Sequence, residues 1–204
     1  MAHLSENTIP LKILNHDYSN EFSKIITSNP NSVWFLHLPT FDSVLSYEKS
    51  EFPNIIDNIV RTCDDNAIIT VLTSPIGAAE ICSRLPLEAR LKLWVAVKSK
   101  DIIADNNILT EDHYSLIVLS KNDSTLKHTK TRIGYTYCPH CNKTTKDYGG
   151  KKHVYHHYGT LMSDVWRDIS VSIHEYPKEL LTRLSDLFGI PSYNNLLYIS
   201  MLNI

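Results

Sequence analysis

Glycine is scarce in this chain, which has only six glycines in 204 residues. No two of them are separated by a single intervening residue, so the pattern G-x-G does not occur. Loops that cradle phosphates or dinucleotides need glycines at such spacings, because the backbone must approach the ligand closely. The sequence therefore excludes a Walker loop and a dinucleotide-binding fingerprint within this chain.

Long hydrophobic runs are also missing. The longest, such as Ala67–Leu72 and Leu93–Val97, are far shorter than the ~20 residues that a membrane-spanning helix needs. The N-terminal segment Met1–Asn7 is polar, with no apolar stretch behind it, which does not fit a secretory signal. We expect a cytoplasmic protein with no membrane partner. The net charge of −2 does not by itself indicate a nucleic-acid partner.

Strand and helix patterns alternate over the first 120 residues. Apolar runs at Ser32–Leu36, Ala67–Leu72, Leu91–Val97 and Tyr114–Leu119 predict buried strands. Phe52, Ile55, Ile56, Ile59 and Val60 recur at helical spacing and predict a helix between the first two strands. Such alternation indicates an α/β fold with a largely parallel sheet. Further along, the pattern predicts a helix over Pro177–Phe188, capped by Gly189, and a last strand over Leu196–Leu202.

The segment from Lys121 to Lys152 differs in composition from the rest. It carries eight lysines and arginines against two aspartates, and few aliphatic residues. We interpret it as a polar inserted module that contacts DNA phosphates, with a merely solvated basic face as the alternative. The predicted DNA-binding residues are Lys127, Lys130, Arg132, Lys143, Lys146, Lys151, Lys152, Trp166 and Arg167.

Cysteines and histidines in the same segment predict a structural zinc site. Cys138, Cys141, His153 and His157 form the pattern C-x2-C-x11-H-x3-H, which supplies four ligands for a tetrahedral ion. His140 and His156 compete with the two chosen histidines. The alternatives are a loop without metal that carries surface histidines, and a redox pair of cysteines. Cys63 and Cys82 lie in apolar segments and are expected to be buried thiols.

Two motifs near the C-terminus resemble a known family. Ser163-Asp164-Val165-Trp166, followed by His174 and the pattern P-x-x-L-x-x-R-L over Pro177–Leu184, is similar to amino-group DNA methyltransferases of the permuted β arrangement. These enzymes modify adenine N6 or cytosine N4. Leu11–Tyr18, Ser32–Phe41, Leu91–Lys98 and His113–Lys121 extend the resemblance at low identity. It implies a methyltransferase-like (Rossmann-like) sheet into which the small Cys/His zinc-knuckle module is inserted, at the place of the family's target-recognition region.

The sequence departs from that family at two places that matter for catalysis. The family's tetrad D/N/S-P-P-Y/F/W corresponds to Leu38-Pro39-Thr40-Phe41. Leu38 has no atom to accept a hydrogen bond from the target amino group, so no catalytic residue is assigned. The final strand, Asn195–Leu202, lacks the glycines that approach S-adenosylmethionine in the family. We therefore expect no binding of S-adenosylmethionine by this chain alone.

These features predict a methyltransferase-like DNA-binding or recognition subunit, inactive on its own, that acts with a catalytically competent partner, as in restriction–modification. The alternatives are one half of a split S-adenosylmethionine-dependent DNA methyltransferase, or a zinc-stabilised nucleic-acid-binding scaffold. Three regions are predicted: a catalytic-half-like region over 1–120, a basic recognition module over 121–160, and a return helix and strand over 161–204. We also expect the last strand to expose an apolar face that another subunit covers.

Overall fold

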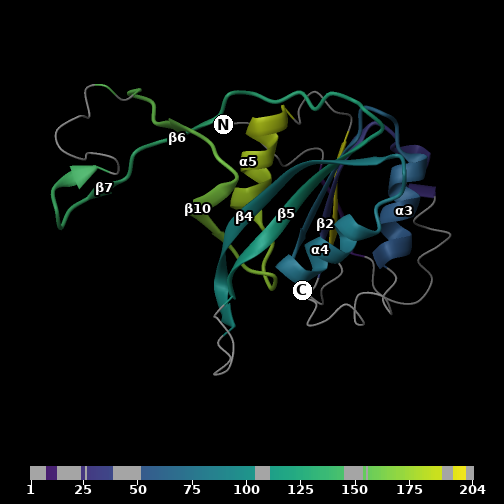
Figure 1. Ribbon diagram of the computed structural model, residues 1–204, viewed down its shortest axis with the longest axis horizontal. Coiled ribbons are helices and arrows are strands. Elements are labelled where there is room, and N and C mark those ends of the chain that lie inside the picture. Colours follow the sequence, from purple (N-terminus) through teal and green to yellow (C-terminus); the bar gives the residue numbers. More distant parts are fainter. Residues whose placement is uncertain are drawn as a thin grey trace.

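A seven-stranded sheet organises the chain. The computed structural model describes residues 8–12, 24–25, 27–38, 52–103, 111–144, 154, 156–189 and 195–200. The strands lie in the order β1-β11-β2-β3-β5-β4-β10, and Figure 1 labels β2, β5, β4 and β10 of this sheet. Their bounds are β1 Thr8–Lys12, β2 Ser32–His37, β3 Ile68–Thr73, β4 Ala89–Ile103, β5 Glu111–Lys121, β10 Val165–Val171 and β11 Asn195–Ser200.

Strand directions make the sheet mostly parallel, as predicted. β1, β11, β2 and β3 pair in parallel, and so do β4 and β10. β5 is antiparallel to both of its neighbours, β3 and β4. The carboxyl ends of β1, β11, β2, β3, β4 and β10 therefore lie at one end of the sheet, which is where open α/β sheets generally bind ligands.

Helices cover both faces of the sheet. α3 (Phe52–Thr62) and α4 (Pro75–Ser83) pack with one cluster of buried residues, which includes Trp34 and Leu36. α5 (Lys178–Phe188) packs on the opposite face with Val33 and Phe35. The alternation of side chains along β2 explains this division, because successive residues of a strand point to opposite faces.

Helix ends follow the chemistry of the sequence. The Ser74 hydroxyl accepts a hydrogen bond from the Gly77 N–H at 3.2 Å and caps α4, whose first residue is Pro75. Gly189 ends α5 in the left-handed conformation with φ of 60°, which glycine adopts at little cost. The predicted cap at Gly189 is therefore confirmed. No described helix is long and apolar enough to cross a membrane.

The predicted elements are largely confirmed, with two differences. β10 was not predicted as a strand, because its exposed positions Val165, Arg167 and Asp168 interrupt the apolar pattern. The expectation of an exposed apolar face on the last strand is wrong for its described part. β11 lies inside the sheet between β1 and β2, and Leu196 and Ile199 are buried. The strand β1 covers the edge that was expected to be open.

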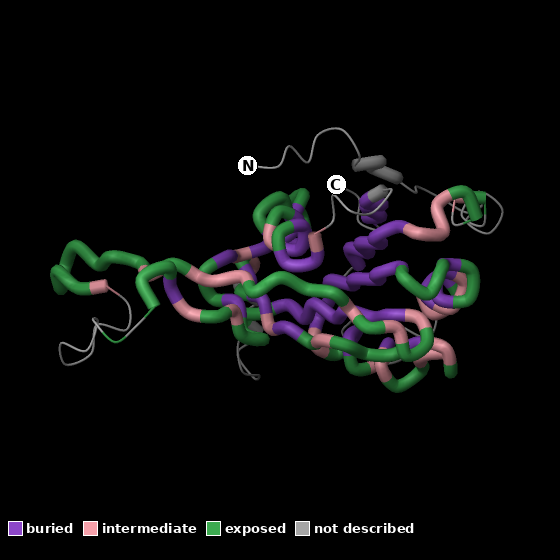
Figure 2. Tube along the Cα trace, turned by 90° about the horizontal axis from the view of Figure 1, so that it is seen from above, coloured by how far each residue is buried: buried purple, intermediate pink, exposed green. Residues whose placement is uncertain are grey.

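The polar segment leaves the sheet after β5 and returns before β10. Two short ribbons order it: β6 (Arg132–Ile133) pairs with β9 (Thr160–Leu161), and β7 (Tyr137–Cys138) pairs with β8 (Lys143–Thr144). Figure 1 shows β6 and β7 on an arm that projects from the sheet, and most of its described residues are exposed in Figure 2. We call residues 121–161 the arm.

Gly159 fixes the base of the arm. Its φ is 104°, and a Cβ placed there would stand 1.9 Å from the carbonyl oxygen of Ile133. The close approach of β6 and β9 therefore needs glycine at this position. Arg132 reinforces the same crossing, because its Nη1 donates to the Gly159 carbonyl at 2.9 Å.

Candidate functional site

Leu38 follows the carboxyl end of β2, where the family resemblance places the first tetrad residue. Its N–H donates to the Leu72 carbonyl at 3.0 Å, which holds the chain against β3. The side chain is only 1% exposed and belongs to the same core cluster as Leu36 and Val71. Leu38 is thus a packed core residue. The other three predicted tetrad positions, Pro39, Thr40 and Phe41, lie outside the described residues.

A buried histidine and tyrosine join the ends of β2 and β11. The Nδ1 atom of His37 lies 2.9 Å from the Tyr198 hydroxyl, and the Tyr198 ring stacks on Phe35 with centroids 5.7 Å apart. Burial lowers the pKa of His37 to about 4 and raises the pKa of Tyr198 to about 12. Both groups are therefore neutral at pH 7.

His37 was not singled out from the sequence as a site residue. The sequence feature that could have identified it is its position, because it is a polar residue directly after the apolar run Ser32–Leu36. Its Nε2 atom is buried and has no hydrogen-bond partner among the described residues, which is uncommon for a buried polar atom. The histidine is the most unusual polar group at this end of the sheet.

The end of β11 bears on the expected absence of S-adenosylmethionine. The strand, Asn195–Ser200, contains no glycine, so each of its residues carries a side chain where a closely approaching ligand would need bare backbone. The side chains of His37, Tyr198 and Ser200 are all buried at the strand ends. The absence of S-adenosylmethionine binding by this chain alone stays a prediction.

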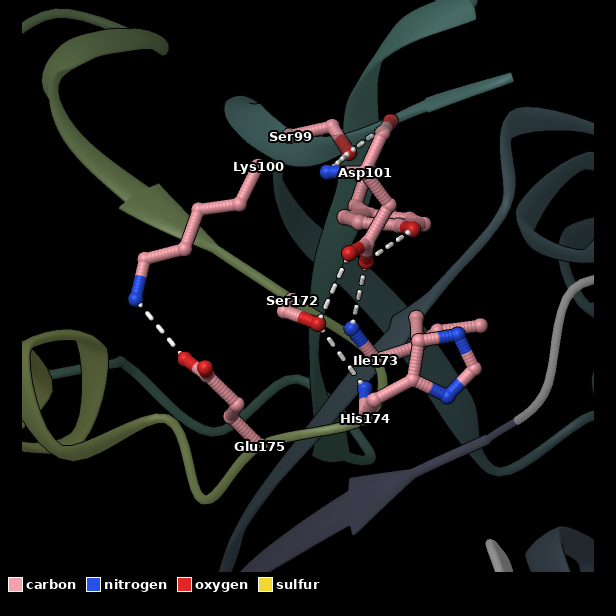
Figure 3. A network of polar contacts seen from close by, with 8 residues as sticks. Ser99, Lys100, Asp101, Ser172, Ile173, His174 and Glu175 are labelled. Atoms are coloured by element: carbon pink, nitrogen blue, oxygen red, sulfur yellow. Dashed lines mark hydrogen bonds and ion pairs between the residues drawn. The ribbon is translucent and has the colours of Figure 1, made fainter.

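Asp101 organises the carboxyl ends of β4 and β10 (Figure 3). Its carboxylate accepts hydrogen bonds from the Tyr114 hydroxyl at 2.8 Å, the Ser172 hydroxyl at 2.9 Å and the Ile173 N–H at 3.0 Å. Partial burial acts to raise the pKa of Asp101, but these hydrogen bonds outweigh it and lower the pKa below its ordinary value. The network ties the connection between β10 and α5 to β4. Tyr114, Ser172 and Ile173 all donate to this one carboxylate, so we assign the network a structural role and call it the Asp101 clasp.

The predicted zinc ligands are only partly described. Cys138 and Cys141 are exposed free thiols at the β7–β8 turn, and His157 stacks on His156 with ring centroids 5.3 Å apart. His153 lies outside the described residues. Within the part of the chain that the structure describes, no three histidine, cysteine or acidic side chains gather as a metal site. The zinc site is therefore not supported.

Eight of the nine predicted DNA-binding residues fall into three groups. Lys127, Lys130, Lys143 and Arg167 are exposed, and the structure gives them no ion pair with a described residue. Arg132 is held by Gly159, as described above. The remaining lysines lie outside the described residues: Lys146, Lys151 and Lys152.

Trp166 is placed differently from its prediction as a DNA contact. It is 1% exposed and packs in the core beneath α5. Its Nε1 donates to the Ser163 carbonyl at 2.7 Å, and the Arg183 guanidinium lies 5.3 Å from its ring centroid. Arg183 in turn pairs with Asp168. The Asp164–Trp166 motif therefore serves to anchor β10, and its neighbour Arg167 is the exposed residue.

Comparisons with known proteins place this architecture among methyltransferases. The chain is 29% identical over 136 residues to the Type II methyltransferase M.BamHI of Bacillus amyloliquefaciens. The match covers 64% of this chain but only 32% of M.BamHI, so the chain spans about a third of that relative. A scan against protein-family models finds no match.

Solved structures give the same result for the fold. The crystal structure of M1.HpyAVI matches with a TM-score of 0.54 at 7% identity, covering 94% of this chain and 91% of that one. The M1.HpyAVI-SAM complex matches with a TM-score of 0.52 at 9% identity, covering 94% and 93%. The chain therefore has a methyltransferase-like α/β fold with a mostly parallel sheet, and the resemblance to methyltransferases is confirmed. The permuted β class and the loss of activity stay predictions.

Burial of His37 predicts a pH-dependent loss of stability. Its folded pKa of about 4 lies below the ordinary 6.5, so the unfolded chain binds this proton more readily. Stability should fall as the pH drops from about 6.5 to 4, with this histidine contributing about 3 kcal/mol in total. Urea unfolding of the wild type and of His37→Gln at pH 7 and pH 4.5 measures the effect. The variant should lose less stability on acidification, whereas exposed His113→Gln should behave like the wild type. An identical fall in all three proteins would refute the role of His37.

Because Leu38 is packed in the core, we expect that replacing it with a polar residue of the family's tetrad destabilises the fold. Leu38→Asn should lower the free energy of unfolding by about 3 kcal/mol or more, because it buries an amide in an apolar cluster. Leu38→Met should cost less than about 1.5 kcal/mol. Chemical denaturation of both variants measures the difference. Equal stability of Leu38→Asn and wild type would mean that the side chain faces an open site.

Proposed function

We propose that this chain is a methyltransferase-fold subunit that binds DNA and acts beside a catalytically competent partner, without methylating on its own. The observation that carries the proposal is the burial of Leu38 in the core at the end of β2. Similarity to a Type II methyltransferase makes DNA the expected macromolecular ligand and restriction–modification the expected setting.

The chemistry of amino methylation explains why Leu38 matters. The lone pair of an exocyclic amino nitrogen is delocalised into the base, and hydrogen-bond acceptors around its N–H groups make it available for attack on a methyl group. Removing one preorganised polar group of this kind costs about 10²–10³ in rate. A leucine packed against Leu36 and Val71 supplies no acceptor, so the activating half of the reaction is missing at this position.

The arm and Arg167 supply the proposed DNA contacts. The exposed cations Lys127, Lys130, Lys143 and Arg167 are available for phosphates, and Lys146, Lys151 and Lys152 extend the same basic run in the sequence. Carboxylates occupy the guanidiniums of Arg61, Arg90 and Arg183 elsewhere in the fold. Lys24, Lys92, Lys98 and Lys178 are also exposed and have no ion pair with a described residue, so the support for the arm is the density of its basic run in the sequence.

A second candidate is one half of a split methyltransferase. It is favoured by the extent of the match to M.BamHI, about a third of that protein. It is also favoured by the Nε2 of His37, the residue directly before Leu38, because this buried atom has no hydrogen-bond partner among the described residues. In this arrangement a separate chain supplies the loop that holds S-adenosylmethionine. The S-adenosylmethionine held by that second chain would then complete an active site to which this chain contributes only part of the residues.

A methyl-transfer assay separates these possibilities. The purified chain, incubated with tritiated S-adenosylmethionine and duplex DNA, should incorporate no label above a protein-free blank, because buried Leu38 offers no acceptor for the target amino group. M.BamHI under the same conditions serves as the positive control. Label that appears only after a second chain is added supports the split enzyme. Incorporation by this chain alone would contradict the proposal.

DNA binding should depend on salt and on the exposed cations. We expect the affinity for a duplex to fall steeply between 50 and 200 mM salt, since phosphate contacts release counterions. Lys143→Ala and Arg167→Ala should each weaken binding and reduce the salt slope by about 1. Fluorescence anisotropy across a salt series measures both quantities, with Lys178→Ala on α5 as the matched loss of one charge. Binding that ignores salt, or equal effects of all three variants, would refute the proposed DNA face.

A further inference from the structure

A cavity in the described part of the chain lies away from the strand ends considered so far. It has a volume of about 680 Å³, within the usual range for small-molecule pockets. Lys92 and Leu93, from the first half of β4, form one wall. Leu187 and Phe188, from the last turn of α5, form another. These positions lie toward the amino ends of the parallel strands, whereas Leu38 and His37 lie at the carboxyl ends.

The pocket lies beside the first residues of β4, because the pairing of β10 with β4 begins only at Ala96. The first paired residue of β10, Val165, lies opposite Ala96, so the earlier residues of β4 have no described strand beside them on that edge. The segment before β10 instead crosses the gap, and Met162, Ser163 and Asp164 line it. Figure 1 shows α5, β10 and β4 together at the base of the arm.

Hydrogen bonds hold the remaining wall in place. The Thr129 N–H donates to the Leu187 carbonyl at 2.7 Å, and the Thr129 hydroxyl donates to the Asp186 carbonyl at 2.6 Å. The Met162 N–H donates to the Thr131 carbonyl at 3.2 Å. The loop 125–131 is thus pinned over the end of α5, and the pocket is preformed, which lowers the cost of ordering on binding.

The lining combines an apolar interior with basic groups. Its apolar side chains are Leu93, Leu126, Leu161, Met162, Trp166, Leu187 and Phe188. Lys92, Lys130 and His128 also line it and are exposed, against the single carboxylate of Asp164. No ion pair links either lysine to a described residue. An apolar slot beside unpaired cations suits a flat ring that carries an anionic group.

We propose that this pocket binds a nucleotide, with the base against the apolar wall and the phosphate at Lys92 and Lys130. Two sources share this chemistry, a free mononucleotide and one nucleotide of a DNA strand that follows the arm. Only the second source rests on the proposed function. The location favours nucleic acid over an acidic peptide, because the pocket opens where the basic arm leaves the sheet.

Two variants test the pocket without touching the core. Lys92→Glu reverses the charge at the proposed phosphate position, and Leu161→Trp places a larger ring at a residue that is 54% exposed and lines the cavity. Lys178→Glu, on the exposed first turn of α5, is the matched charge reversal outside the pocket. Circular dichroism and thermal unfolding of each variant check that it is folded.

Calorimetric titrations with the four deoxynucleoside monophosphates, inorganic phosphate and a glutamate-rich peptide test the free ligand. Anisotropy with a single-stranded and a duplex oligonucleotide tests the strand. We expect a nucleotide, free or within a strand, to bind more tightly than phosphate alone. Lys92→Glu and Leu161→Trp should each weaken that binding by about tenfold or more, and Lys178→Glu by less than about twofold.

The outcomes distinguish this inference from the proposed function. Mononucleotide binding that Leu161→Trp weakens, without any binding of DNA, supports the pocket and contradicts the proposed function. DNA binding that is sensitive to Lys143→Ala but unchanged by both pocket variants, with no mononucleotide bound, overturns the pocket. Preferential binding of the acidic peptide also overturns it.

Discussion

The proposed lack of methyl transfer depends on which side chains lie at the carboxyl ends of β2 and β11. Open α/β sheets bind ligands at such ends because adjacent strands diverge there and leave a crevice. In this protein Leu38 packs into one face of the sheet, and His37, Tyr198 and Phe35 pack together on the other. The strand ends thus present an apolar side chain on one face and a buried, neutral histidine–tyrosine pair on the other.

This constraint divides the molecule into two functional ends. At one end Leu38 is buried after β2, and at the far edge of the sheet the Asp101 clasp ties β4 to the segment that follows β10. The other end carries the arm, its unpaired lysines and the open pocket beneath the start of β10. Binding of DNA without methylation is consistent with this division, because the groups available to phosphates lie apart from the position where a methyl group would be transferred.

Periodic hydrophobicity was enough to predict most of the sheet. Strands such as β2 and β3 are buried on both faces, so their continuous apolar runs are unambiguous, and α3 and α5 present regular apolar stripes. β10 escaped prediction because it lies at the sheet edge, where alternate side chains such as Arg167 face water. The pairing of β1 with β11 could not be predicted from the sequence, because the two strands are separated by most of the chain and their register depends on tertiary contacts.

Site residues were harder to predict than elements. Leu38 could be identified because a motif fixed its position, and its chemistry follows from the residue type. Trp166 was misplaced because a tryptophan next to arginine resembles a DNA contact, while its burial depends on α5 packing over β10. His37 was missed because its significance comes from a partner 161 residues away. Cysteine and histidine spacing suggested a metal that the described residues do not support.

Calorimetric titration of S-adenosylmethionine into the chain saturated with duplex DNA tests the central claim most directly. The absence of glycine from β11 leads us to expect no heat of binding beyond dilution, both with and without DNA. One-to-one binding of S-adenosylmethionine by this chain, with a dissociation constant in the micromolar range, would contradict the account.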